Sequence, residues 1–226
     1  MTETRRLIDV SHTVEHGMIT YQGLPAPIIC DYLSREASHR RYAAGTEFQI
    51  GRIEMVANTG TYVDSPFHRY ADGKDLSQLP LESLADLDCV VARIPPGSTA
   101  VDELPLTGAQ VRGRAVLVHT GWDRHWRTDA YHTDHPHLTA RAARWLVEAG
   151  AVLVGIDSFN IDSVKTGERP VHSELLRHDI PIVEHLRGLD AVPEQGSRFF
   201  AVPVKVKAFG SFPVRAFALL GASTRP

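Results

Sequence analysis

Several features that mark membrane proteins and nucleic-acid-binding proteins are missing from this sequence. No run of about 18 or more apolar residues occurs, so no membrane-spanning helix is expected. The 24 Lys and Arg residues are balanced by 27 Asp and Glu residues, giving a net charge of −3, and no basic block stands out. Proteins that bind nucleic acid through its phosphates usually present a clustered positive surface. We therefore expect neither a membrane nor a nucleic acid as a partner.

Cysteine is also scarce, and its two occurrences lie far apart. Cys30 and Cys89 both stand in apolar surroundings, which predicts two buried free thiols rather than a disulfide. The first residues lack the apolar core of a signal peptide. Together these features predict a cytoplasmic protein.

The apolar segments that are present alternate between strand-like and helix-like patterns. With 226 residues and 43% hydrophobic content, the chain suits one domain spanning residues 1–226. The alternation favours an α/β fold with a mixed sheet. Strands are predicted at 7–14, 47–57, 88–94, 115–119, 151–156, 180–184, 198–209 and 212–220, helices at 138–149 and 170–177, and loops at 15–27, 34–45, 58–68 and 123–137.

Four residues from separate segments have side chains that bind metals or move protons, namely Asp64, His68, His172 and Glu184. Two carboxylates and a histidine can hold a divalent transition metal such as Zn²⁺ or Mn²⁺. The remaining histidine can act as a general acid/base. Taken one at a time, each also has an ordinary explanation: a turn aspartate, a solvated helix histidine or an exposed strand glutamate.

Two further polar groups leave alternatives open. His132, His135 and His137 have a spacing that suits a metal, but they lie in a polar segment that we interpret as a loop over a pocket or at a subunit contact. Asp157 and Asp162 follow a buried strand, where α/β proteins often place functional groups. Capping of the following turn is the interpretation we favour for both aspartates.

The segment from Asn58 to His68 reads Asn-Thr-Gly-Thr-Tyr-Val-Asp-Ser-Pro-Phe-His. It resembles the motif H-x-G-T-H-x-D-x-P-x-H of the cyclase family, also called the kynurenine formamidase-like metal-dependent hydrolases. The likeness extends over nearly the whole chain. The other matching segments are Asp9–Val14 with Met18 and Tyr21–Gly23, Thr120–Trp122, His135–Leu138, Gly155–Ser158 with Asp162, and His172 followed twelve residues later by Glu184.

The resemblance implies an α/β fold of the swivelling β/β/α type with a mixed β-sheet core. It also implies a homo-oligomer, either a homodimer or a homotetramer. Members hydrolyse amides or cyclic amides of formylkynurenine or isatin type, using one or two metals. By position in the motif, Asp64 would be a bridging metal ligand, His172 and Glu184 would complete the site, and His68 would be the acid/base. Tyr21 falls where members place an aromatic side chain against the substrate.

The sequence departs from the motif at two metal-ligand positions, where Asn58 and Tyr62 replace histidines. An amide oxygen and a neutral phenol are poor metal ligands. We therefore expect one divalent metal, zinc or manganese, bound by Asp64, His172 and Glu184. Such a metal would lower the pKa of the water molecule bound to it. Tyr62 would donate a hydrogen bond to a developing oxyanion.

The predicted activity is hydrolysis of an amide, lactam or ester bond of a small carbonyl compound. Tyr21, Asn58 and Trp122 are predicted to contact this substrate, although core packing explains Trp122 equally well. A second hypothesis removes the metal and gives Tyr62, Asp64 and His68 the acid/base chemistry of a cyclase, dehydratase or isomerase. A third is a non-catalytic protein that binds a small molecule on the same scaffold.

Overall fold

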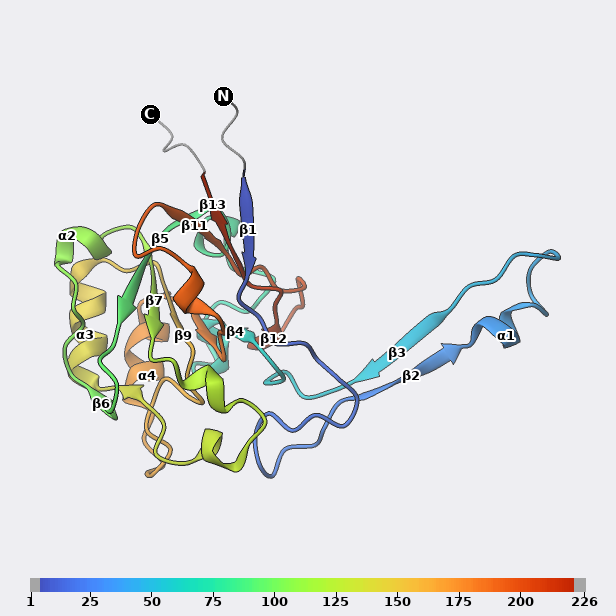
Figure 1. The fold of residues 1–226 in the computed structure, drawn as a ribbon, viewed down its shortest axis with the longest axis horizontal. Helices are drawn as coiled ribbons and strands as arrows, with labels where there is room; N and C mark the ends of the chain where they lie inside the picture. The colour runs from blue at the N-terminus through green and yellow to red at the C-terminus, as the bar shows by residue number, and fades with distance from the viewer. Residues whose placement is uncertain (1–4, 222–226) are drawn as a thin grey trace.

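The computed structural model describes residues 5–221 of the chain. Its body contains a nine-stranded mixed sheet with the strand order β1-β13-β11-β5-β7-β9-β10-β4-β12 (Figure 1). The strands are β1 Arg6–Asp9, β4 Tyr62–Asp64, β5 Leu87–Arg93, β7 Ala115–His119, β9 Leu153–Ile156, β10 Ile182–Glu184, β11 Ser197–Phe200, β12 Ser211–Pro213 and β13 Phe217–Leu220. The predicted α/β fold with a mixed sheet is confirmed.

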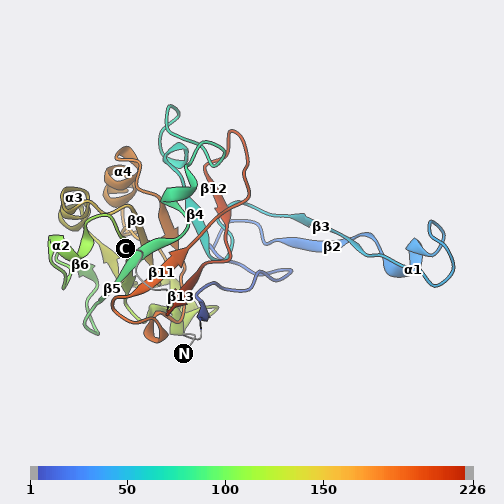
Figure 2. The ribbon, with the colours of Figure 1, turned by 90° about the horizontal axis from the view of Figure 1, so that it is seen from above.

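The four central strands, β5, β7, β9 and β10, run parallel, and antiparallel strands flank them on both sides. Their sequences are mostly apolar because both faces of the sheet are covered. Helices α3 (Ala140–Ala149) and α4 (Pro170–Arg177) pack on one face, where Leu146 and Leu175 join strand residues in one apolar cluster (Figures 1 and 2). Phe199 belongs to the cluster on the other face.

Both long helices begin and end where local chemistry predicts. The side chain of Thr139 accepts a hydrogen bond from the backbone of Ala142 at the start of α3, and Gly150 ends that helix with a φ of 82°. Pro170 takes the first position of α4, where its fixed φ suits a helix and its missing N–H is not needed. The helix predictions are therefore confirmed.

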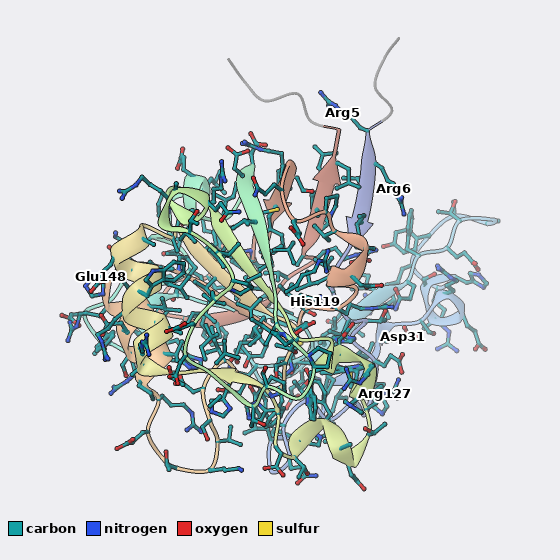
Figure 3. All side chains as sticks on the ribbon, turned by 60° about the vertical axis from the view of Figure 1, so that its left-hand side comes forward. Arg5, Arg6, Asp31, His119, Arg127 and Glu148 are labelled. Carbon is teal, nitrogen blue, oxygen red and sulfur yellow. The ribbon has the colours of Figure 1, made fainter. Side chains whose placement is uncertain are left out.

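A two-stranded hairpin, which we call the arm, projects from the body (Figures 1 and 2). It consists of β2 (Ile28–Leu33), the short helix α1 (Arg35–Ser38) and β3 (Ile50–Glu54). Every residue of the two strands except Leu33 is exposed. Figure 3 labels Asp31 on the arm and His119 in the body.

The remaining elements are short. A parallel pair is formed by β6 (Ala100–Val101) and β8 (His137–Leu138), and α2 spans Gly108–Val111. Single 3-10 turns occur at Pro66–His68, Leu81–Ser83, Trp122–His125, Asp129–His132 and Leu189–Ala191. No helix in the described part of the chain has the length and apolar character needed to cross a membrane.

Several local predictions were wrong. The predicted loop at 58–68 contains the buried strand β4, because the backbone of this segment pairs with β10 on one side and with β12 on the other. The predicted strand at 198–209 ends at Phe200, and the segment 212–220 is divided between β12 and β13.

The arm accounts for three further errors. The sequence prediction missed β2, and it placed α1 within an irregular loop. Cys89 is buried as predicted, but Cys30 is exposed because it lies on the arm. An apolar segment that projects from the body does not become buried.

Candidate active site

The pairing of β4 with β10 brings three of the candidate residues to one face of the sheet. Tyr62 lies opposite Glu184 in this antiparallel pair. Asp64 stands two residues after Tyr62, so its side chain points to the same face. His172 reaches that face from the first turn of α4. Residues more than 100 positions apart in the sequence thus meet through strand pairing.

His172 lies between the two carboxylates. Its Nε2 atom is 3.7 Å from Asp64 Oδ2 and 3.7 Å from Glu184 Oε1. Asp64 Oδ2 is buried, and no hydrogen-bond partner for it occurs within residues 5–221. A buried carboxylate oxygen without a partner is unfavourable. A cation between these atoms would satisfy it, so the donor set fits a divalent metal.

His68 belongs to the same group. One potential ligand atom each from Asp64, His68 and His172 lies within 4.8 Å of the others. Ser211 connects Asp64 to His68, since its hydroxyl donates to Asp64 and lies 2.9 Å from His68 Nδ1. About a third of the His68 side chain is exposed, whereas Asp64 is fully buried. His68 therefore combines contact with the buried group and access to a ligand.

Asp162 holds the ring of His172 in place. Its Oδ2 atom lies 2.7 Å from His172 Nδ1, and the same carboxylate accepts hydrogen bonds from the backbone N–H groups of Val171 and His172. Asp162 therefore binds the first turn of α4 rather than the turn that follows it directly, and it also turns Nε2 of His172 toward the carboxylates. Burial opposes a charge on His172, but Asp162 and Asp64 stabilise it and raise its pKa to about 10.

Glu184 is satisfied mainly by neutral donors. Its Oε1 atom accepts from the backbone N–H of Ile161 at 2.7 Å, and Oε2 accepts from the hydroxyls of Tyr62 and Tyr21. Burial and the nearby charge of Asp64 raise the pKa of Glu184, although His172 opposes this shift. Burial and the charge of Glu184 raise the pKa of both tyrosines, which keeps their phenols protonated. The neutral hydroxyl of Tyr62 is therefore a hydrogen-bond donor to Glu184.

These side chains open into one cavity. The residues that line it are Tyr21, Leu24, Asn58, Tyr62, His68, Arg69, Asn160, Arg169, His172 and Glu184. Six of the eight predicted site residues line this cavity. A seventh, Asp64, lies buried beside His68 and His172. Trp122 does not line this cavity. Its indole donates to the backbone of Tyr131 at 3.0 Å, and it borders a separate hollow beside Pro95.

Four lining residues were not predicted from the sequence, the apolar Leu24 and the polar Arg69, Asn160 and Arg169. Arg69 directly follows His68, and Arg169 precedes Pro170 at the start of α4. Their positions next to predicted elements of the site were the available signal. Asn160 donates to Tyr21 at 3.0 Å, a contact across 139 residues that no local pattern indicates.

The histidine-rich segment lies behind the cavity. Buried His135 packs edge-on against Phe159, and Phe159 also contacts Tyr21. Trp126 stacks on His12 with ring centres 3.9 Å apart. Within residues 5–221, the grouping that could hold a metal is the one at Asp64, and this segment forms none. Aromatic packing therefore accounts for this segment.

Comparisons with known proteins identify relatives along most of the chain. A family model described as "Putative cyclase" matches residues 8–163. The kynurenine formamidase of Erythrobacter litoralis is 28% identical over 204 residues, covering 89% of this chain and 88% of that protein. The kynurenine formamidase of Bacillus cereus is 26% identical over 223 residues, covering 95% and 97%.

Solved structures share the fold. Isatin hydrolase A from Labrenzia aggregata superposes with a TM-score of 0.77 at 21% identity, covering 96% of this chain and 94% of that one. A protein described as a potential metal-dependent hydrolase with cyclase activity gives a TM-score of 0.74 at 24% identity, covering 99% and 100%. The match of the family model over residues 8–163 confirms the family resemblance seen in the sequence, and these structures confirm the fold.

Proposed function

Because the chain belongs to the cyclase family, we propose that it is a hydrolase that cleaves the amide bond of a small carbonyl compound. The same chemistry would also hydrolyse a lactam or an ester of such a compound. The relatives named as kynurenine formamidases support an amide as the reacting group, and they match over nearly their whole length.

The observation that carries this proposal is the placement of His172 Nε2 midway between two buried carboxylates, 3.7 Å from each. We propose that one divalent metal, zinc or manganese, is held there by Asp64, His172 and Glu184. When bound, such a metal lowers the pKa of a water and polarises a carbonyl. Asp162 would fix the ring of His172 for this role, as carboxylates commonly do for metal-binding histidines.

His68 is assigned the proton transfers. Its partial exposure to the cavity and its hydrogen-bond contact with Ser211 suit a group that gives a proton to a leaving nitrogen. For Tyr62 we propose a different part from the predicted oxyanion donor. Because its hydroxyl donates to Glu184, it would position that carboxylate rather than stabilise an oxyanion. Tyr21, which also donates to Glu184, and Asn58 line the cavity where the substrate would lie.

The metal can be tested by removing and restoring it. Protein treated with a chelator and dialysed should lose formate release from N-formylkynurenine and regain it with one equivalent of Zn²⁺ or Mn²⁺ per chain. Asp64→Asn should abolish both metal binding and activity, whereas Asp31→Asn on the arm should retain both. Full activity without stoichiometric metal would favour the metal-independent acid/base chemistry of Tyr62, Asp64 and His68. Ligand binding without turnover would favour a non-catalytic binding protein.

We also propose that a second copy of the chain covers the arm. A two-stranded hairpin is marginally stable alone in water. On this arm Ile29 lies opposite Ile53 with 36% and 58% of their surfaces exposed, and Tyr32 is 70% exposed. Light scattering should show a homodimer or homotetramer, and Ile53→Lys should shift it toward monomer. The choice between these assemblies and the cytoplasmic location stay predictions.

A further inference from the structure

The cavity contains two guanidinium groups that the proposed reaction does not use. Arg69 follows the 3-10 turn that carries His68, and Arg169 precedes the helix that carries His172. Both line the same cavity as the candidate metal ligands. Arg69 is exposed and Arg169 is partly buried, whereas Asp64, His172 and Glu184 are buried. The positive groups therefore lie toward the solvent side of the cavity.

Neutral groups of the protein hold both arginines. The Nη1 atom of Arg169 donates to the backbone oxygens of Ser163, Thr166 and Glu168 at 3.1, 2.8 and 2.7 Å. The Nε atom of Arg69 donates to the hydroxyl of Ser173 at 3.2 Å. Within residues 5–221, no carboxylate oxygen lies within 4.0 Å of either guanidinium. Both side chains are anchored and keep donors for a ligand.

The acidic groups of the cavity do not neutralise these charges. Asp64 and Glu184 lie against His172, and Glu184 also accepts from two tyrosines. A guanidinium presents a planar set of donors that matches a carboxylate and remains charged at all working pH values. An anion at the mouth of the cavity would therefore meet two anchored positive groups.

We propose that the substrate carries a carboxylate that binds to Arg69 and Arg169, while its amide lies at Asp64, His172 and Glu184. This proposal rests on the proposed hydrolase function and names the class of substrate for that site. The two arginines would select acids over neutral amides of the same shape, since a neutral analogue would leave both guanidinium groups without a partner.

The test uses pairs of substrates that differ only in charge. Formamidobenzoates with the carboxylate at ring position 2, 3 or 4 are compared with their methyl esters, using the metal-loaded full-length enzyme. Binding of the corresponding aminobenzoates and their esters is measured by calorimetry. We expect at least one acid to exceed its ester about 10-fold in kcat/KM and in affinity, the range for hydrogen bonds to charged groups.

Arg177 provides a matched control for Arg69. Its guanidinium lies 4.0 Å from the centre of the Tyr70 ring, and that of Arg69 lies 5.2 Å from the same ring, but Arg177 does not line the cavity. Arg69→Met should lose about 10-fold on the preferred acid and less than about 2-fold on its ester. Arg177→Met should change neither substrate. Arg169→Lys, which keeps the charge, should weaken the acid selectively.

The outcomes separate the two proposals. Equal affinity and equal kcat/KM for every acid and ester pair would overturn the carboxylate site. So would an Arg69→Met variant that loses no more than Arg177→Met on the acid. If the wild-type enzyme hydrolyses none of these formamides, nor formanilide, nor N-formylkynurenine, the amidase proposal fails. In that case the affinities of the aminobenzoates and of their esters, measured by calorimetry, decide alone whether the cavity binds a carboxylate.

Discussion

The two walls of the cavity hold their polar groups in different ways. The wall formed by α4 and β10 carries His172 and Glu184, with Asp162 behind them, and all three are buried. The wall formed by β4 and the following 3-10 turn carries Tyr62 and Asp64 among its buried residues, but it also exposes His68 and half-buries Asn58. The polar side chains of the first wall are buried, whereas those of the second wall extend from the buried interior to the solvent.

Hydrogen bonding follows the same division. On the α4–β10 wall, Asp162 fixes Nδ1 of His172, and both oxygens of Glu184 accept hydrogen bonds. On the β4 wall, one oxygen of Asp64 has no partner within the described residues. Tyr62 crosses from one wall to the other through its bond to Glu184. We propose from this difference that Asp162 and Tyr62 position the site and that His68, on the open wall, carries out the proton transfers.

The largest expected effect comes from the reacting wall. His68→Gln should lower kcat about 100- to 10,000-fold, the usual contribution of a general acid/base. Metal content should remain at that of the wild type, because the proposed ligands are untouched. Activity and elemental analysis on the same sample check this, with the exposed His178→Gln as the control. Loss of the metal together with activity would make His68 a ligand and contradict the assignment.

A smaller effect is expected from the positioning wall. Asp162→Asn should weaken metal affinity about 10- to 100-fold, the range found for partners of metal-binding histidines. The altered side chain holds His172 less firmly and no longer supports its basicity. Titration with a competing chelator measures the affinity. The control is Asp157→Asn, another buried aspartate beyond β9, which contacts Thr120 instead. Equal affinities in the two variants would remove Asp162 from the site.

Tyr62 joins the two walls, so its removal should mainly affect stability. Tyr62→Phe leaves Glu184 with one donor fewer in a buried place, which should cost about 1–3 kcal/mol in the free energy of unfolding. We expect kcat/KM to change less than about 10-fold, whereas an oxyanion donor would contribute about 100- to 1,000-fold. Urea unfolding and steady-state kinetics check both values. A loss of the larger size with unchanged stability would restore the oxyanion role.

The sequence predicted what local patterns determine. Helix α3 was found from its apolar spacing and from Gly150, and the central strands were found from continuous apolar runs. Strand β4 could not be found in this way. Its residues are Tyr, Val and Asp, and it is a strand because β10 and β12 pair with it from segments more than 100 residues away.

The same limit applies to the candidate site. The motif around Asp64, with His172 and Glu184, was sufficient to predict which residues meet. It could not predict that Arg169 lines the cavity, because three backbone oxygens of the preceding loop hold this side chain in place. Nor could it reveal that Tyr62 would contact Glu184, because that contact depends on the pairing of β4 with β10.

The smallest expected effect is a pH dependence of the free energy of unfolding that arises from Asp157, the residue used above as the control for Asp162. Burial raises the pKa of Asp157 from 3.8 to about 7, although hydrogen bonds from Thr120 and Gly121 oppose the shift. Between these two values the unfolded chain releases a proton that the folded protein keeps. The contribution to stability is therefore complete below pH 3.8 and declines until about pH 7, by up to about 1.4 kcal/mol per pH unit.

Asp157→Asn removes the titrating group, so its stability should fall less steeply than that of the wild type as the pH rises from 5 to 7. Urea unfolding at intervals across this range measures the difference between the two proteins, in which the titrating groups distant from Asp157 cancel. His119, whose Nε2 lies 3.8 Å from Asp157 Oδ2, is therefore replaced by Gln in both proteins. The asparagine also loses one acceptor, because its amide nitrogen would face the N–H of Gly121 or Thr120. That loss lowers stability at every pH and leaves the slope unaffected. Parallel curves would mean that Asp157 is ionised throughout, and the turn at Thr120 would then be held by a charged carboxylate.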